Sequence, residues 1–122
     1  MEGIFVALAI PFKNGKLDKE SLARHVDSLT KAGVDGFYPF GTTSQGPYLT
    51  LEERKEALEV ITRNTNKQLM VHVFSFNWQE VVETVRLAER YGAVAISSIP
   101  PIYYKPDYDT LRRYYEKLSQ LT

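Results

Sequence analysis

The sequence contains no cysteine, which excludes disulfide bonds, thiolate metal sites and catalysis by a thiol nucleophile. It has no excess of either charge, because 15 basic and 15 acidic side chains give a formal net charge of zero. A balanced surface lacks the positive field that attracts nucleic acid or an anionic membrane. No apolar run approaches the roughly 18 residues of a membrane span, and the start Met1-Glu2-Gly3 has no basic leader. We therefore expect a cytoplasmic protein with no nucleic-acid or membrane partner.

Clusters of metal ligands are also missing from the sequence. The two histidines, His25 and His72, are far apart and have no carboxylates around them at metal-ligand spacing. A place on a helix surface for His25 and in a strand core for His72 is the simpler interpretation. We expect no metal and no cofactor.

The length and the composition are typical of one globular domain. The chain has 122 residues, of which 43% are apolar and 25% charged. That length allows one hydrophobic core and is too short for two. We therefore expect a single domain over residues 1–122.

An apolar run followed by a helical pattern occurs four times along the chain. Continuous apolar runs are typical of strands buried on both faces of a parallel sheet, and residues of the helix-capping type follow each run. Glycines stand where the first and third helices should end, at Gly33 and Gly92. The expected strands span residues 4–10, 36–40, 69–74 and 93–99, and the expected helices begin at Asp18, Thr50, Asn77 and near Asp107.

Four strand–helix units at a spacing of roughly 25 to 33 residues predict parallel strands joined by right-handed crossovers, hence an α/β fold. Two architectures fit this pattern. One is a parallel (βα)4 half of a (β/α)8 barrel, a fold that takes about 250 residues when complete. The other is a small open doubly wound sheet. A half-barrel exposes two unpaired strand edges, which something has to cover.

The turn Gly41-Thr42-Thr43-Ser44-Gln45-Gly46-Pro47 is the first candidate for a functional site. It follows an apolar strand and precedes a helix start. Such a turn places free backbone N–H groups and hydroxyls together, and this chemistry captures a small carboxylate or phosphate. An ordinary connecting loop has a similar composition, so the pattern alone leaves both interpretations open.

Three motifs together resemble the N-terminal half of the dihydrodipicolinate synthase and N-acetylneuraminate lyase superfamily. They are Ala9-Ile10-Pro11-Phe12, the Gly41–Pro47 turn with Leu49-Thr50-Leu51-Glu52-Glu53-Arg54, and Pro101-Ile102-Tyr103-Tyr104-Lys105-Pro106. Within the superfamily the chain is most similar to archaeal-type 2-keto-3-deoxygluconate aldolases, because of the Gly46-Pro47 pair and the Pro-x-Tyr-Tyr-x-Pro segment. The resemblance covers essentially the whole chain and about two fifths of the family's usual length. It implies the half-barrel, with the C-terminal half of the barrel absent.

The resemblance also implies roles for individual residues. In these enzymes pyruvate forms a Schiff base with a lysine on the sixth strand, and a tyrosine on the fifth strand shuttles protons; neither strand is present here. Thr42 would belong to a proton relay, and Thr43 would hold the pyruvate carboxylate. Gly41 would let the backbone approach the ligand. Tyr104 would complete the relay, reaching into the site of a neighbouring subunit.

Some positions depart from the family pattern. Ser44 stands where many members have glycine, which conflicts with any positive φ there, and Gln45 stands where the synthases commonly have glutamate. Asp107 replaces a basic residue that accompanies phosphorylated substrates. Lys105 lies near the expected site and is a candidate surrogate for the Schiff-base lysine, although a solvated, protonated lysine is the simpler interpretation.

The sequence leads to one main functional hypothesis and two alternatives. The main one is half of a class I pyruvate-dependent aldolase that cleaves 2-keto-3-deoxygluconate to pyruvate and glyceraldehyde and is inactive without its missing half. A dihydrodipicolinate synthase is the first alternative, and a non-catalytic, self-associating half-barrel is the second. The expected partners are pyruvate and either further copies of the chain or a complementing half-barrel chain.

Overall fold

Four short parallel strands form the main sheet of the structure, a computed structural model that describes residues 1–122. Their order in the sheet is β1-β4-β5-β6, and every neighbouring pair is parallel. The strands are β1 (Phe5–Ala7), β4 (Gly36–Tyr38), β5 (Gln68–His72) and β6 (Ala95–Ser97). The helices are α1 (Lys19–Lys31), α2 (Leu51–Asn64), α3 (Trp78–Arg90) and α4 (Tyr108–Ser119). None of these helices has the length and hydrophobicity needed to cross a bilayer.

The helices begin where the sequence predicts. At each start a side-chain oxygen accepts a hydrogen bond from a backbone N–H of the first turn, which satisfies a donor that the helix leaves free. At α2 the box is reciprocal, because Glu53 also accepts from the N–H of Thr50 at 2.8 Å. Gly33 and Gly92 follow α1 and α3 with φ of 94° and 78°, the left-handed conformation that ends helices. The capping residues are Asp18 for α1, Thr50 for α2, Asn77 for α3 and Asp107 for α4.

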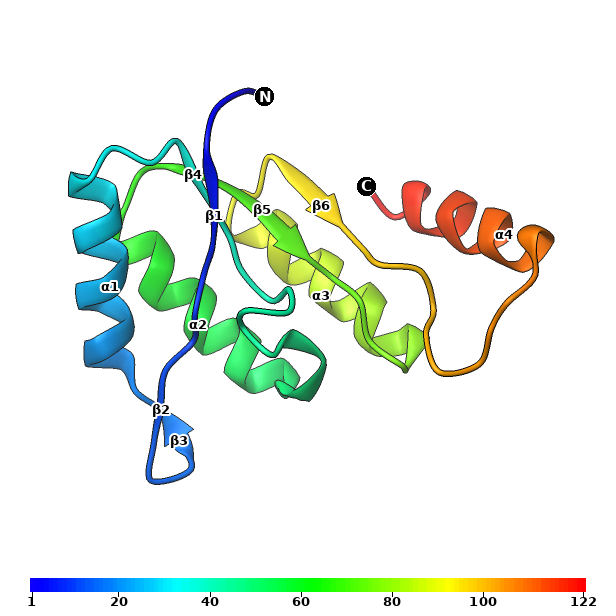
Figure 1. The fold of residues 1–122 in the computed structure, drawn as a ribbon, viewed down its shortest axis with the longest axis horizontal. Helices are drawn as coiled ribbons and strands as arrows, with labels where there is room; N and C mark the ends of the chain where they lie inside the picture. The colour runs from blue at the N-terminus through cyan, green and yellow to red at the C-terminus, as the bar shows by residue number, and fades with distance from the viewer.

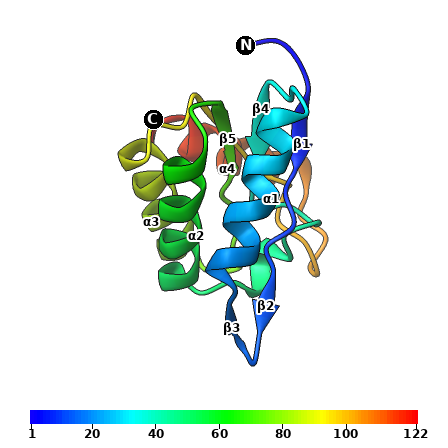
Figure 2. The same cartoon turned by 90° about the vertical axis from the view of Figure 1, so that its left-hand side faces the viewer.

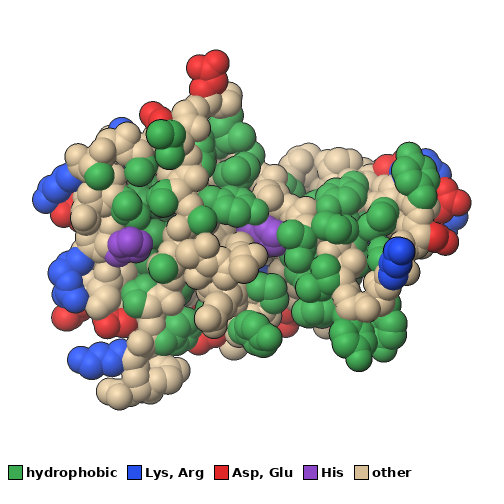
Figure 3. All heavy atoms as spheres, viewed as in Figure 1, with side chains coloured by type: hydrophobic (Ala, Val, Ile, Leu, Met, Phe, Trp, Pro, Cys, Tyr) green, Lys and Arg blue, Asp and Glu red, His purple; other side chains and the backbone are tan.

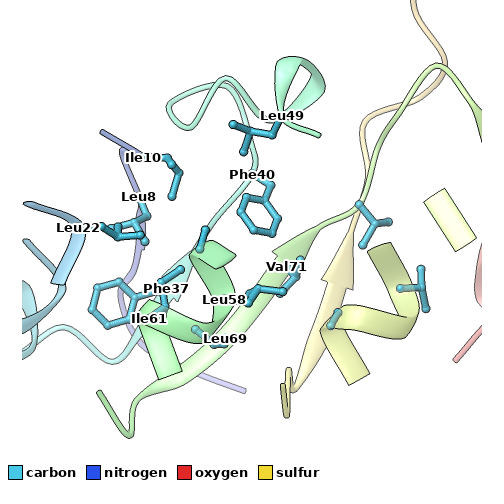
Figure 4. Packing of buried hydrophobic residues seen from close by; sticks show 14 of the residues in the cluster. Leu8, Ile10, Leu22, Phe37, Phe40, Leu49, Leu58, Ile61, Leu69 and Val71 are labelled. Carbon is cyan, nitrogen blue, oxygen red and sulfur yellow. The ribbon is translucent and has the colours of Figure 1, made fainter. Parts of the chain in front are cut away.

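The hydrophobic core lies between the sheet and helices α1 to α3. Strand side chains such as Phe37 and Val71 are fully buried and pack with Leu58 and Ile61 of α2 (Figure 4). Burying one such side chain contributes about 1.5–3 kcal/mol. Helix α4 adds only Leu118 to the buried residues.

The helices leave one face of the sheet uncovered. Helices α1, α2 and α3 lie side by side (Figure 2) behind the strands, and α4 lies beyond β6, at the far end from α1 (Figure 1). A doubly wound sheet carries helices on both faces, so that alternative is wrong. The fold is a parallel (βα)4 unit, half of a (β/α)8 barrel, and the uncovered face is the one that lines a barrel's interior. Hydrophobic side chains are spread over this face (Figure 3).

The structure has two small elements that the sequence analysis did not predict. An antiparallel hairpin of β2 (Phe12–Lys13) and β3 (Lys16–Leu17) turns through Asn14 and Gly15, whose φ angles are 53° and 75°. A 3₁₀ turn, η1 (Gly46–Tyr48), follows the Gly41 turn.

The strands are shorter than the apolar runs that predicted them. Strand β4 ends at Tyr38 because Pro39 has no N–H for the ladder and Phe40 adopts a φ of 74°. Past the ends of the assigned strands, isolated bonds continue the pairing, such as the one from the N–H of Leu8 to the carbonyl of Tyr38 at 3.1 Å. The apolar runs therefore predicted the strand positions and overestimated their lengths.

Candidate active site

The turn after β4 presents unpaired backbone donors at the carboxyl ends of the parallel strands. Within the turn, the N–H of Gln45 donates to the carbonyl of Thr42 at 2.9 Å, and the N–H of Gly46 donates to that of Gly41 at 3.1 Å. The four successive N–H groups of residues 41–44 make no hydrogen bond within the chain. Successive free amides at this edge of the sheet can bind an oxyanion such as a carboxylate.

Ser44 fixes the turn to the neighbouring strand. Its buried hydroxyl accepts a hydrogen bond from the N–H of Phe40 at 2.8 Å and donates one to the carbonyl of Leu8, just past β1. The residues of the turn with positive φ are Phe40 (74°) and Gln45 (54°), and Ser44 is not among them. Serine at a position where many family members have glycine therefore causes no backbone strain. Gly46 is required for a different reason: a Cβ there would collide with the carbonyl oxygen of Phe40.

Arg54 of α2 connects the turn to α3 by hydrogen bonds. Its guanidinium is buried and donates from Nη2 to the carbonyl of Gly46 at 3.0 Å and from Nη1 to the hydroxyl of Thr84 on α3 at 2.6 Å. No carboxylate forms a salt bridge with it, and Nε has no hydrogen-bond partner. Burial lowers the pKa of Arg54, and the charge of Glu80 opposes that shift. A buried positive charge that forms no ion pair therefore lies next to the turn.

The two threonines of the turn line different hollows. Gly41 and Thr42 line a cavity of about 500 Å³ together with His72 and Ile102. Thr43 lines a neighbouring hollow of about 430 Å³ on the side of the β2–β3 hairpin. Both threonine side chains are exposed. The structure thus brings Gly41 and Thr42 into one cavity and places Thr43 beside it.

A layer of three polar side chains crosses the uncovered face of the sheet. The hydroxyl of Tyr38 on β4 is hydrogen-bonded to Nδ1 of His72 on β5 at 2.8 Å and to Oγ of Ser97 on β6 at 2.9 Å. The rings of Tyr38 and His72 meet edge to face, with centroids 5.9 Å apart. Because His72 lines the cavity beside Thr42, this layer connects the sheet to the candidate site.

The imidazole of His72 is held in its neutral form. Only 3% of the residue is exposed, which agrees with the expected place in a strand core. Burial lowers the pKa of His72 from 6.5 to about 4, and the positive charge of Arg54 adds to that shift. No group of three potential metal ligands forms around this or any other side chain. The ring therefore carries one N–H and one unprotonated acceptor nitrogen at neutral pH.

The structure does not bring Tyr104 into the Thr42 cavity. Tyr104 is 81% exposed and lines a separate cavity of about 610 Å³ with residues of α3 and α4. Ile102 lines both cavities. Lys105 is also exposed and forms no salt bridge. Tyr103 beside them has a φ of 79°, an uncommon conformation for an aromatic residue.

Sequence reasoning missed Tyr38 and Ser97 as parts of the site. The available signal was the period of two along each strand, which places polar side chains opposite the helix-facing Phe37, Val71 and Ile96. The contact itself depends on the pairing of His72 with Ser97, and that register is a property of the folded sheet.

Comparisons with known proteins identify the family and the fold of the chain. The model of the dihydrodipicolinate synthetase family matches residues 1–122. A 4-hydroxy-tetrahydrodipicolinate synthase of Campylobacter jejuni subsp. doylei is 34% identical over 121 residues. The structure of N-acetylneuraminate lyase from Mycoplasma synoviae superposes with a TM-score of 0.90 at 33% identity, covering 98% of this chain and 43% of that one. The 2-keto 3-deoxygluconate aldolase from Picrophilus torridus superposes with a TM-score of 0.91 at 29% identity, covering 98% and 44%.

These matches cover nearly all of this chain and less than half of each relative. The alignment with the Campylobacter synthase takes in 97% of this chain and 41% of the synthase. The chain therefore spans about two fifths of the length of the curated relatives that it matches.

Proposed function

Because the chain belongs to the dihydrodipicolinate synthetase family, we propose that it supplies the N-terminal half of the active site of a class I, pyruvate-dependent aldolase. The observation that carries the proposal is the run of unpaired N–H groups over residues 41–44. These donors lie at the carboxyl ends of the strands, where the sites of (β/α)8 enzymes form.

Within this site the turn binds the carboxylate of pyruvate. The N–H groups of Thr42 and Thr43 donate to its oxygens, and the buried charge of Arg54 below the turn favours an anion there. The hydroxyl of Thr42 belongs to the proton relay, because a hydroxyl can both accept and donate a proton without adding a charge. Tyr104 joins that relay from a neighbouring subunit; its high exposure supports this role.

The Schiff base itself forms on a lysine of the second half of the barrel, on the same polypeptide or on another. An amine that forms an imine has to be partly neutral, which takes burial or a neighbouring cation. Lys105 is exposed on a loop and so lacks the burial that activates an amine. The chain alone should therefore bind pyruvate without trapping it.

The reaction of the complete enzyme has two candidates. We infer 2-keto-3-deoxygluconate as the substrate from the Gly46-Pro47 pair and the segment 101–106, which favour the aldolase branch. Dihydrodipicolinate synthase is the second candidate, because a curated synthase is 34% identical to this chain. A half-barrel that binds a carboxylate without turning it over is the remaining alternative.

Borohydride reduction in the presence of pyruvate, followed by intact-mass measurement, tests whether the Schiff-base lysine lies in the second half of the barrel. We expect no pyruvyl adduct on the 122-residue chain and one adduct when the second half of the barrel is supplied. An adduct on the chain alone would place an imine-forming lysine here, with Lys105 as the first variant to make, and would refute the proposed division.

Activity of the completed barrel identifies the aldehyde. Pyruvate release from 2-keto-3-deoxygluconate supports the aldolase, whereas condensation of pyruvate with aspartate semialdehyde supports the synthase. A completed barrel that does neither, yet still binds pyruvate, would leave the non-catalytic alternative.

A further inference from the structure

We propose that His72 donates a hydrogen bond from Nε2 to a 2-keto acid held at the Thr42 turn, and that Tyr38 and Ser97 hold its ring in the donating tautomer. The inference rests on the proposed function for its ligand. It adds a substrate contact from β5 and a positioning pair from β4 and β6.

The geometry places the imidazole between the sheet and the ligand. Nδ1 of His72 is occupied by the hydroxyl of Tyr38 at 2.8 Å, and Nε2 makes no hydrogen bond within the chain. The ring lines the same cavity of about 500 Å³ as Gly41 and Thr42. Nε2 is thus the free polar atom of a nearly buried side chain beside the unpaired N–H groups of the turn.

The hydroxyl of Tyr38 selects the tautomer. It has one proton and lies between two partners, Nδ1 of His72 and Oγ of Ser97. When Ser97 donates to Tyr38 and Tyr38 donates to Nδ1, the only imidazole proton is on Nε2. The amides of the turn are also donors, so a 2-keto acid bound there can accept hydrogen bonds from these amides and from Nε2 of His72. When each group donates a hydrogen bond to the next, from Ser97 to Tyr38, from Tyr38 to His72 and from His72 to the ligand, Tyr38 and both nitrogens of His72 have a partner.

The surroundings of His72 keep the ring neutral, as this role requires. The hydroxyl of Tyr38, itself hydrogen-bonded to Ser97, contacts the ring, and the nearby charge of Arg54 from α2 disfavours a second positive charge. Burial lowers its pKa to about 4. At neutral pH the ring therefore donates a hydrogen bond without carrying a charge.

Nitrogen-15 NMR of the histidine-labelled chain, titrated with pyruvate, tests the inference directly. The chain has two histidines, and His25 lies exposed on α1 as an internal reference. We expect His72 to be protonated on Nε2, and its signals to shift with the same pyruvate dependence as the amides of Thr42 and Thr43. The signals of His25 should not move.

The possible outcomes separate the inference from the proposed function. If the amides shift and His72 does not, or if His72 carries its proton on Nδ1 in the complex, the inference is wrong and the proposed function stands. If neither the amides nor His72 respond to pyruvate, both are wrong.

Two variants probe the positioning pair and the contact. His72→Leu should weaken pyruvate binding roughly tenfold, the effect of one lost hydrogen bond. Tyr38→Phe keeps the ring and removes its hydroxyl, so the His72 signals should become those of a tautomer mixture. Met70→Leu, a change of similar volume on the same strand, is the matched control and should leave the affinity unchanged. A His72→Leu chain that binds pyruvate as tightly as the unaltered chain would overturn the inference.

Discussion

At the scale of single residues, the neutral imidazole of His72 makes the stability of the fold depend on pH. Its folded-state pKa of about 4 lies below the ordinary value of 6.5, so the unfolded chain takes up this proton first as the pH falls. The stability contributed by the neutral imidazole is fully present above pH 6.5 and is lost progressively as the pH falls to about 4. We expect the free energy of unfolding, measured with urea, to fall by about 2 kcal/mol between pH 7.5 and pH 4.5.

Matched histidine variants isolate this effect. His72→Gln should remove most of the pH dependence in that interval, and His25→Gln, on the surface of α1, should retain it. Hydrogen bonds lower the pKa of the capping carboxylates Asp18 and Asp107 below 3.8, so these groups act only at more acidic pH. An equal slope in the unaltered chain and the His72→Gln chain would contradict the assignment.

Arg54 is a second residue whose environment makes a sharp prediction. Its two hydrogen bonds leave in different directions, to Gly46 and to Thr84, and the planar guanidinium supplies both at once. Lysine keeps the charge and loses that fork. Arg54→Lys should therefore lower the free energy of unfolding by about 2 kcal/mol, whereas Arg63→Lys, at an exposed site on the same helix, should change it little. Similar urea midpoints for the two variants would show that Arg54 does not support the turn.

At the scale of elements, local patterns were enough to predict the four strand–helix units. The helix starts at Thr50 and Asn77 follow from contacts within one turn, so the sequence contains everything that determines them. The hairpin through Asn14 and Gly15 was missed although this dipeptide is a strong turn signal. The Tyr38–His72–Ser97 layer could not be predicted in the same way. It depends on the register of three strands whose residues lie far apart in the chain.

The capping box of α2 gives a prediction at this scale. The hydroxyl of Thr50 accepts from the N–H of Glu53 at 3.1 Å, and this helix carries Arg54, which donates to the carbonyl of Gly46 in the site turn. Thr50→Ala should cost about 1 kcal/mol of stability by thermal or urea unfolding. Ser28→Ala, within the exposed part of α1, should be neutral or slightly stabilising, since alanine is the better helix former. A cost at Ser28 equal to that at Thr50 would argue against the cap as the cause.

At the scale of the whole molecule, the half-barrel has two features that a closed barrel hides. Strands β1 and β6 are the edges of the sheet, and each presents unpaired backbone groups along one side. The uncovered face carries hydrophobic side chains (Figure 3), and the loops at its edge expose Phe76, Ile99 and Ile102 by 67%, 37% and 45%. In a complete barrel the second half pairs with both edges and covers this face.

The purified chain should therefore associate with further copies of itself when the C-terminal half of the barrel is absent. Light scattering should give at least twice the monomer mass of 14.0 kDa. Because a charge at the edge of the uncovered face disfavours its burial between copies, Ile99→Lys should shift the distribution toward monomer, and Gln120→Lys, beyond the end of α4, should not. Adding the C-terminal half should convert the assembly into one that contains both halves in equal number. A cooperative melt by a species of monomer mass would show instead that the half-barrel is stable with its edges and inner face in water.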